Sequence, residues 1–264
     1  MKQILTAGVL AMFATTHPAL SDEVTLHAAG SLKAAMTDIA DAFEATTDMQ
    51  VARNFGPSGL LRERIEGGEH AEVFASANMR HPQTLADAAL AGDVTMFARN
   101  SLCGLAQQDI AVSSDTILDV MLSPDTRLGT STPKADPSGD YAWQLFDKAD
   151  AIAPGSTETL KSKALQLTGG PNSATPPEGR NPYGWVMSED QADLFLTYCT
   201  NAVLAQRDTP GLQIVQLPEA LAVGADYGLT VINGASAAAD DLAAFVTGPD
   251  AQKILSSYGF KAPD

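Results

Sequence analysis

Serine residues at three predicted strand-to-helix transitions have the type and spacing needed to bind a ligand. Each serine follows a short strand-like segment and opens a helical pattern: Ser31 in AAGSLKAAM, Ser58 in FGPSGLLRERI and Ser138 in DPSGDYAWQLF. The first turn of a helix has unpaired backbone N–H groups and a partial positive charge, so it attracts anions. A serine in that turn adds a hydroxyl donor, although serine is also a common structural cap. The pattern predicts an anion site made of neutral donors, without lysine or arginine.

Strand-like and helical segments alternate along the chain. Segment 24–29 is strand-like, 31–47 has apolar residues at helical spacing, and 49–56 and 72–78 are further strands separated by a second helix. This alternation predicts an α/β fold with parallel sheets flanked by helices. Because the turns after parallel strands meet at one edge of a sheet, the three serines are expected to face one cleft.

The second half of the chain repeats the pattern after a strand at 100–107. Within it, the Gly- and Pro-rich stretch 169–182 must be loop, and its length indicates a functional loop or an insertion. Segment 188–203, SEDQADLFLTYCTNAV, is predicted to form a helix and then a strand.

The N-terminus has the pattern of a secretory signal peptide. Residues 1–21 contain one lysine, a short apolar run and small residues near the end, which predicts cleavage after Ser21 and a periplasmic location. The apolar run is shorter than the roughly 20 residues that span a bilayer. The formal net charge of −16 argues against nucleic acid and anionic membrane surfaces as partners.

The two cysteines, Cys103 and Cys199, form either a disulfide or two buried free thiols, and the oxidising periplasm favours the disulfide. No Cys or His lies at the spacing of a metal site. Ser58 lacks the glycine pattern of a nucleophile elbow and no persuasive His base follows it, so no enzyme activity and no cofactor are expected.

The chain resembles the periplasmic molybdate-binding proteins over nearly all of its length after the leader. The order and spacing of the motifs carry this resemblance: AAGSLKAAMTDIADAF, FGPSGLLRERIEGG with AEVFASAN, RNSLCGLA, PSGDYA, ADLFLTYCTNAV, YGLTVING and GPDAQKILSSYGF. The resemblance implies a type II periplasmic-binding fold with two lobes, each a mostly parallel sheet flanked by helices, joined by crossing strands. Lobe 1 would comprise residues 22–100 and 235–264, and lobe 2 residues 101–234.

The resemblance also implies a receptor of an ABC importer that closes around a tetrahedral oxyanion, with molybdate or tungstate expected. Ser31 and Ser58 would bind it from lobe 1, and Ser138, Tyr183 and Tyr198 from lobe 2. A membrane permease would be the partner of a monomeric receptor, and the metal inside the oxyanion would be the only metal bound.

Departures from the family leave the ligand open. Pro57 and Gly59 stand where relatives commonly have serines, and the long loop brings Arg180 and Trp185 near the expected cleft. Sulfate, phosphate, a larger organic anion, or ferric iron bound by tyrosines such as Tyr227 are alternatives. A site with only donors would reject a protonated oxyanion, because its O–H would find no acceptor.

Overall fold

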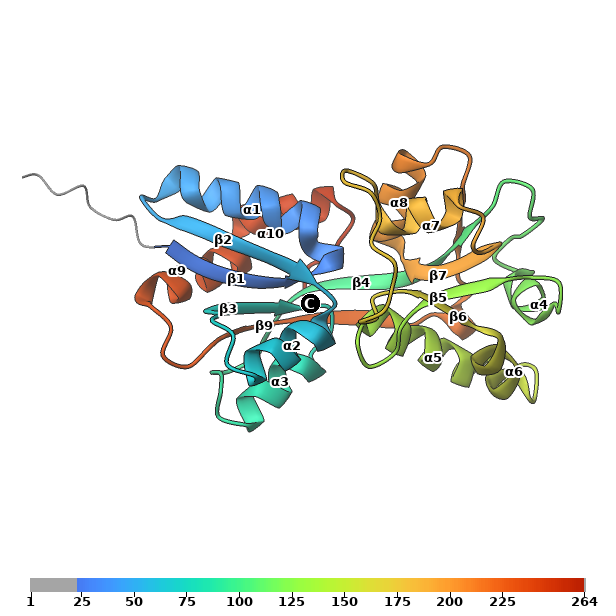
Figure 1. The fold of residues 1–264 in the computed structure, drawn as a ribbon, viewed down its shortest axis with the longest axis horizontal. Coiled ribbons are helices and arrows are strands. Elements are labelled where there is room, and N and C mark those ends of the chain that lie inside the picture. The colour runs from blue at the N-terminus through green and yellow to red at the C-terminus, as the bar shows by residue number, and fades with distance from the viewer. Residues whose placement is uncertain (1–22, 264) are drawn as a thin grey trace, which may run out of the picture.

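The computed structural model describes residues 23–263, and the predicted signal peptide lies outside them. Two lobes lie side by side and are joined by long strands that run between them (Figure 1). Among residues 23–263, no helix has the length and apolar character needed to cross a bilayer.

The first lobe contains a sheet whose three N-terminal strands are parallel, in the order β2-β1-β3. Its strands are β1 (Glu23–Ala29), β2 (Gln50–Gly56) and β3 (Val73–Ser76), and its helices are α1 (Lys33–Thr46), α2 (Ser58–Glu66), α3 (Arg80–Asp87), α9 (Ala237–Thr247) and α10 (Pro249–Ser257). Strand β1 is buried along most of its length, as expected for a parallel strand covered by helices on both faces.

The second lobe has its own sheet, in which β5 pairs in parallel with β6 and with β7. Its strands are β5 (Leu128–Ser131), β6 (Leu165–Thr168), β7 (Leu194–Tyr198) and β8 (Gln213–Gln216), and its helices are α4 (Ile117–Leu122), α5 (Pro137–Ala149), α6 (Ser156–Lys163), α7 (Pro182–Ser188) and α8 (Cys199–Asp208). Short 3-10 turns, η1 (Gly30–Leu32) and η2 (Glu219–Leu221), complete the elements.

Strands β4 (Thr95–Ala106) and β9 (Gly224–Val231) connect the lobes. The first part of β4, residues 95–101, pairs with β9, whereas residues 102–106 pair with β7 and β8. All of these pairings are antiparallel. The predicted α/β fold is therefore confirmed, with parallel pairing inside each lobe and antiparallel pairing at the strands that cross between them.

The predicted order of segment 188–203 was wrong. Its polar start ends helix α7 in a turn, where Asp190 has a positive φ of 52°, and the strand β7 comes next, followed by helix α8. All five residues of β7 are buried between β4 and β5, so sheet pairing decides their conformation.

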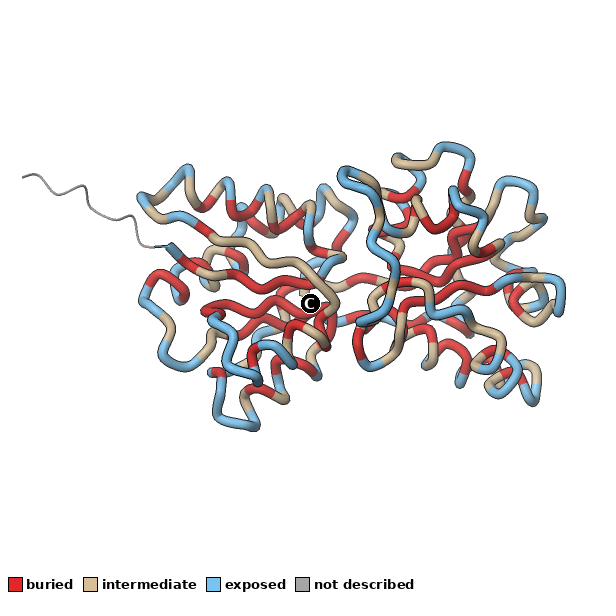
Figure 2. The backbone as a smooth tube through the Cα atoms, viewed as in Figure 1, coloured by how far each residue is buried: buried red, intermediate tan, exposed pale blue. Residues whose placement is uncertain are grey.

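A disulfide joins Cys103 in β4 to Cys199 at the start of α8, with a Cα–Cα distance of 4.9 Å. Buried residues follow the strands and the inner helix faces in both lobes (Figure 2). One apolar cluster runs through the crossing strands from one lobe into the other, so the connection between the lobes is itself part of the core.

Candidate functional site

A cleft of about 1040 Å³ lies between the lobes. The first lobe lines it with the turn before α1, the start of α1 and the end of β2 with the start of α2. The second lobe contributes Asp136, the loop between β6 and α7, and the end of β7 with α8. The loop, residues 169–181, passes in front of the gap between the lobes in Figure 1. Strand ends and helix starts therefore meet here, as parallel sheets dictate.

Ser58, the first residue of α2, is fully buried and lines the cleft. Its Oγ accepts a hydrogen bond from the backbone N–H of Ala77, at 3.1 Å. Because a hydroxyl has one proton and two lone pairs, this bond leaves the Ser58 proton available for another acceptor. Ser58 is thus oriented as a donor.

Ser31 lies in the η1 turn and also lines the cleft. Its Oγ is 3.0 Å from the Tyr227 hydroxyl, which in turn accepts from Asn100 Nδ2 at 3.3 Å. Burial raises the pKa of Tyr227 above its ordinary value, so the phenol stays protonated and can donate to Ser31. The crossing strands β4 and β9 therefore hold Ser31 in place.

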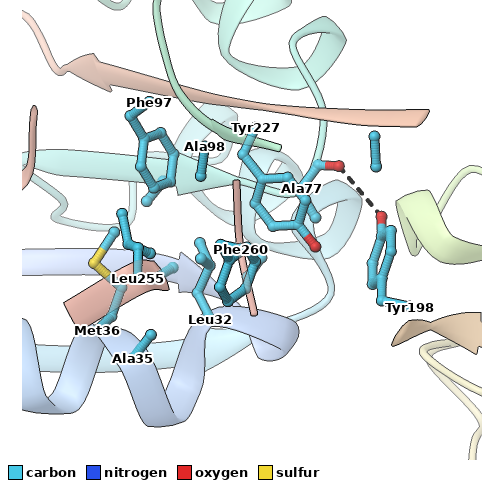
Figure 3. Packing of buried hydrophobic residues seen from close by; sticks show 14 of the residues in the cluster. Leu32, Ala35, Met36, Ala77, Phe97, Ala98, Tyr198, Tyr227, Leu255 and Phe260 are labelled. Carbon is cyan, nitrogen blue, oxygen red and sulfur yellow. Dashed lines mark hydrogen bonds between the residues drawn. The ribbon is translucent and has the colours of Figure 1, made fainter. Parts of the chain in front are cut away.

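Tyr198, the last residue of β7, lines the cleft from the second lobe. Its hydroxyl donates to the backbone carbonyl of Ala77 at 3.2 Å (Figure 3). Ala77 thus binds Ser58 through its N–H and Tyr198 through its carbonyl oxygen. The Tyr198 hydroxyl connects the two lobes in this structure, and burial raises its pKa well above the usual value.

The lobes touch each other directly in this structure. The N–H of Gly59 in α2 donates to the carbonyl oxygen of Ala135 at 2.8 Å, and Arg80 forms an ion pair with Asp140 across the same boundary. A Cβ on Gly59 would lie 2.2 Å from the carbonyl oxygen of Lys134. The close approach requires glycine at this position.

Ser138 does not line the cleft. It is the second residue of α5 and is fully buried, and its N–H donates to Asp136 Oδ1 at 3.0 Å. Asp136, which caps this helix, lines the cleft instead, and burial raises its pKa to about 6. Sequence reasoning missed Asp136, although an Asp before a Pro is a common way to begin a helix.

The long loop contributes to the cleft in a way that the sequence did not resolve. Tyr183 lines the cleft, but its N–H already donates to Asn181 Oδ1 at 3.0 Å, and its ring packs 5.4 Å from that of Phe195. Arg180 also lines the cleft and pairs with Asp208, at 3.1 Å. Trp185 packs on the second-lobe core and is not among the lining residues.

Charged side chains also line the cleft, including Arg180, which was predicted from the sequence to lie near it. Besides Arg180, the exposed Lys33 at the start of α1 lies at its edge, as do Asp38 and Glu178. Within residues 23–263, no group of three or more His, Cys, Asp or Glu side chains is arranged to hold a metal ion.

Comparison with known proteins identifies the family to which this chain belongs. The family model described as bacterial extracellular solute-binding protein matches residues 24–261. An uncharacterised protein of Pasteurella multocida is 37% identical over 88% of this chain and 96% of its own length. The molybdate-binding protein ModA of Escherichia coli is 28% identical over 97% of this chain and 96% of its own. The sulfate-binding protein SubI of Mycobacterium tuberculosis superposes with a TM-score of 0.74 at 17% identity, covering 92% of this chain and 88% of that one. The chain belongs to the bacterial extracellular solute-binding proteins, which are non-enzymatic receptors of ABC importers.

Proposed function

We propose that this receptor binds the oxyanion group of its solute between Ser31 and Ser58, in the cleft between the lobes. The observation that carries the proposal is the bond from the Ala77 N–H to Ser58 Oγ, which leaves the serine proton as a donor. Ser31 offers a second hydroxyl beside it, held by Tyr227. Lys33 adds a positive charge at the edge of the cleft.

Molybdate and tungstate are the first candidates, because the chain is similar to a molybdate-binding protein over 97% of its length. A larger organic anion is the second candidate. A volume of about 1040 Å³ is at the upper end of what drug-sized ligands occupy, and the loop of residues 169–181 walls it on one side. Both candidates use the same two serines.

The lobes are proposed to separate in the empty receptor and to close on the ligand. Lobe 1 would consist of residues 22–100 and 235–264, and lobe 2 of residues 101–234. Contacts such as Gly59 N–H to Ala135 O form only when the lobes meet, so a ligand that bridges the lobes favours the closed form. A monomeric receptor, exported by the predicted signal peptide, would then dock on a membrane permease.

A thermal-shift titration tests the proposal. The purified receptor is melted with molybdate, tungstate, sulfate and phosphate, alongside Ser31→Ala, Ser58→Ala and the control Ser162→Ala, which changes an exposed serine on α6. A ligand at about 1,000 times its Kd stabilises the folded state by about 4 kcal/mol, a shift of several degrees. We expect the shift to survive Ser162→Ala and to disappear in the other two variants. An equal shift in all four proteins would refute the site.

A further inference from the structure

We propose that Asp136 accepts a hydrogen bond from the bound solute, so that the receptor selects an oxyanion that carries its own hydrogen-bond donor. The inference rests on the proposed function, because it takes the oxyanion group to lie at Ser31 and Ser58. It names the class of ligand that the same cleft prefers, and it places an anion with its own donor ahead of molybdate and tungstate, which the similarity to molybdate-binding proteins favours.

Asp136 lies close to Ser58, at the point where the two lobes touch and line the same cleft. The Gly59 N–H and the Ala135 carbonyl oxygen are 2.8 Å apart, and these residues adjoin Ser58 and Asp136 in the chain. Standard backbone dimensions then place the Cα atoms of Ser58 and Asp136 within about 8 Å of each other. An oxyanion bound to the Ser58 hydroxyl is therefore within reach of the Asp136 side chain, and both residues line the same cleft.

The Asp136 carboxylate keeps acceptor capacity for a ligand. Its Oδ1 accepts from the Ser138 N–H, and the Ser131 hydroxyl is a second donor to the carboxylate. An ionised carboxylate has about four acceptor positions, so at least one remains. The loop backbone packs closely on the other oxygen, since a Cβ on Gly169 would lie 2.4 Å from Asp136 Oδ2. This packing fixes the carboxylate in position at the wall of the cleft.

No cation neutralises this carboxylate among residues 23–263. The ion pairs of the described chain do not include Asp136, and the charged group that acts on it is another acid, Asp140. Burial, together with the nearby Asp140, also raises the pKa of Asp136 to about 6. An unpaired carboxylate in an anion site is costly unless the ligand compensates for it.

The consequence for ligand choice follows from the charges. A fully deprotonated oxyanion at Ser58 would repel the carboxylate, whereas a ligand with an O–H or N–H directed at Asp136 would form a charge-assisted hydrogen bond. This inference is the opposite of the expectation that the site offers donors only and rejects protonated oxyanions. The donor can belong to the oxyanion itself, as in hydrogen phosphate, or to a neighbouring hydroxyl, as in a hydroxy acid.

Two matched ligand pairs distinguish these sources. Phosphate and sulfate are both tetrahedral dianions near pH 7.5, but only phosphate keeps a proton. Malate and succinate differ by one hydroxyl group. We would measure the four affinities by calorimetry for the wild-type receptor, for Asp136→Asn and for Asp38→Asn, a control that removes the same charge from the edge of the cleft. Asparagine keeps the capping oxygen for the Ser138 N–H, so the helix start is preserved.

We expect wild type to prefer the member of one pair that carries the donor by on the order of 100-fold, as sites built around a buried hydrogen bond do. Asp136→Asn should abolish that preference and Asp38→Asn should retain it. The opposite result is that the receptor prefers sulfate, succinate, molybdate or tungstate over phosphate and malate, and that this preference is lost in Ser31→Ala but unaffected by Asp136→Asn. That result would refute this inference and leave the proposed function intact. Binding of none of these anions, with molybdate and tungstate included, would refute both.

Discussion

Replacing Gly59 with alanine should weaken ligand binding without lowering the stability of the ligand-free protein. The new Cβ would lie 2.2 Å from the Lys134 carbonyl oxygen and 2.7 Å from that of Ala135. Both distances are below 3.0 Å, and Cβ atoms in proteins essentially never approach another heavy atom so closely. Both oxygens belong to the backbone of the second lobe and cannot swing aside as a side chain would. The lobes would have to part by about 1 Å to restore ordinary van der Waals contact.

Gly59→Ala is expected to stabilise the open form of the receptor and to destabilise the closed form. In the open form Gly59→Ala meets no second lobe, and exchanging a helical glycine for alanine stabilises the protein by up to about 1 kcal/mol, or about 2–4 °C in Tm. In the closed form the variant loses the Gly59–Ala135 hydrogen bond, worth about 1 kcal/mol, and overpacking adds about 1–3 kcal/mol. Closing against this cost should weaken ligand affinity about 30-fold or more.

Calorimetric melts of the ligand-free protein and a titration with whichever anion stabilises wild type would measure both effects. Gly92→Ala is the control, because its Cβ would make an ordinary 3.7 Å contact within the first lobe. We expect Gly59→Ala to melt no lower than wild type without ligand and to lose most of the ligand-induced shift. Wild-type affinity in Gly59→Ala would show that ligand binding does not require the closed form, and the reasoning would fail.

Three further measurements follow from the same contacts. Because burial raises the folded-state pKa of Asp136 from 3.8 to about 6, its contribution to stability is present at pH 3.8 and lost as the pH rises through 6. Asp136→Asn should therefore raise the free energy of unfolding at pH 8 by up to about 3 kcal/mol and have little effect at pH 4; an equal effect at both would contradict the pKa. The Cys103–Cys199 disulfide closes a loop with a sequence separation of 96, so reducing it should lower Tm by roughly 10 °C. An unchanged Tm would show that the disulfide does not stabilise the folded protein. Tyr198→Phe removes the bond to the Ala77 carbonyl, so ligand affinity measured by calorimetry should fall about fivefold with little change in the ligand-free melt; unchanged affinity would place that bond outside the closing equilibrium.

The sequence predicted the elements well where apolar spacing and strand pairing agree. Strand β1 and helix α1 lie within a residue or two of their expected ends, because both bury a continuous apolar set. Segment 188–203 was misread because LFLTY fits a buried strand and a buried helix turn equally well until its neighbours in the sheet are known.

For the site, the sequence located the helix starts but not the directions of their side chains. Ser58 faces the cleft as the first residue of its helix, whereas Ser138, one position later in α5, is rotated into the core and leaves Asp136 at the cleft. The positions of Arg180 and Trp185 relative to the cleft depend on the path of the long loop, which composition does not determine. Their placement follows from tertiary contacts, namely the Asp208 ion pair and the second-lobe core.

The route of the chain through two lobes also determines when the protein can fold. Strand β3 pairs with β9, whose residues come about 150 positions later, and helices α9 and α10 cover the first lobe from the very end of the chain. A chain that emerges N-terminus first therefore has an open sheet edge and an uncovered helix α1 until its last residues are available. Such long-range pairing slows folding. The first lobe can therefore complete its sheet and cover helix α1 only after the C-terminal residues are available, so the part of the chain that is made first is among the last to finish folding.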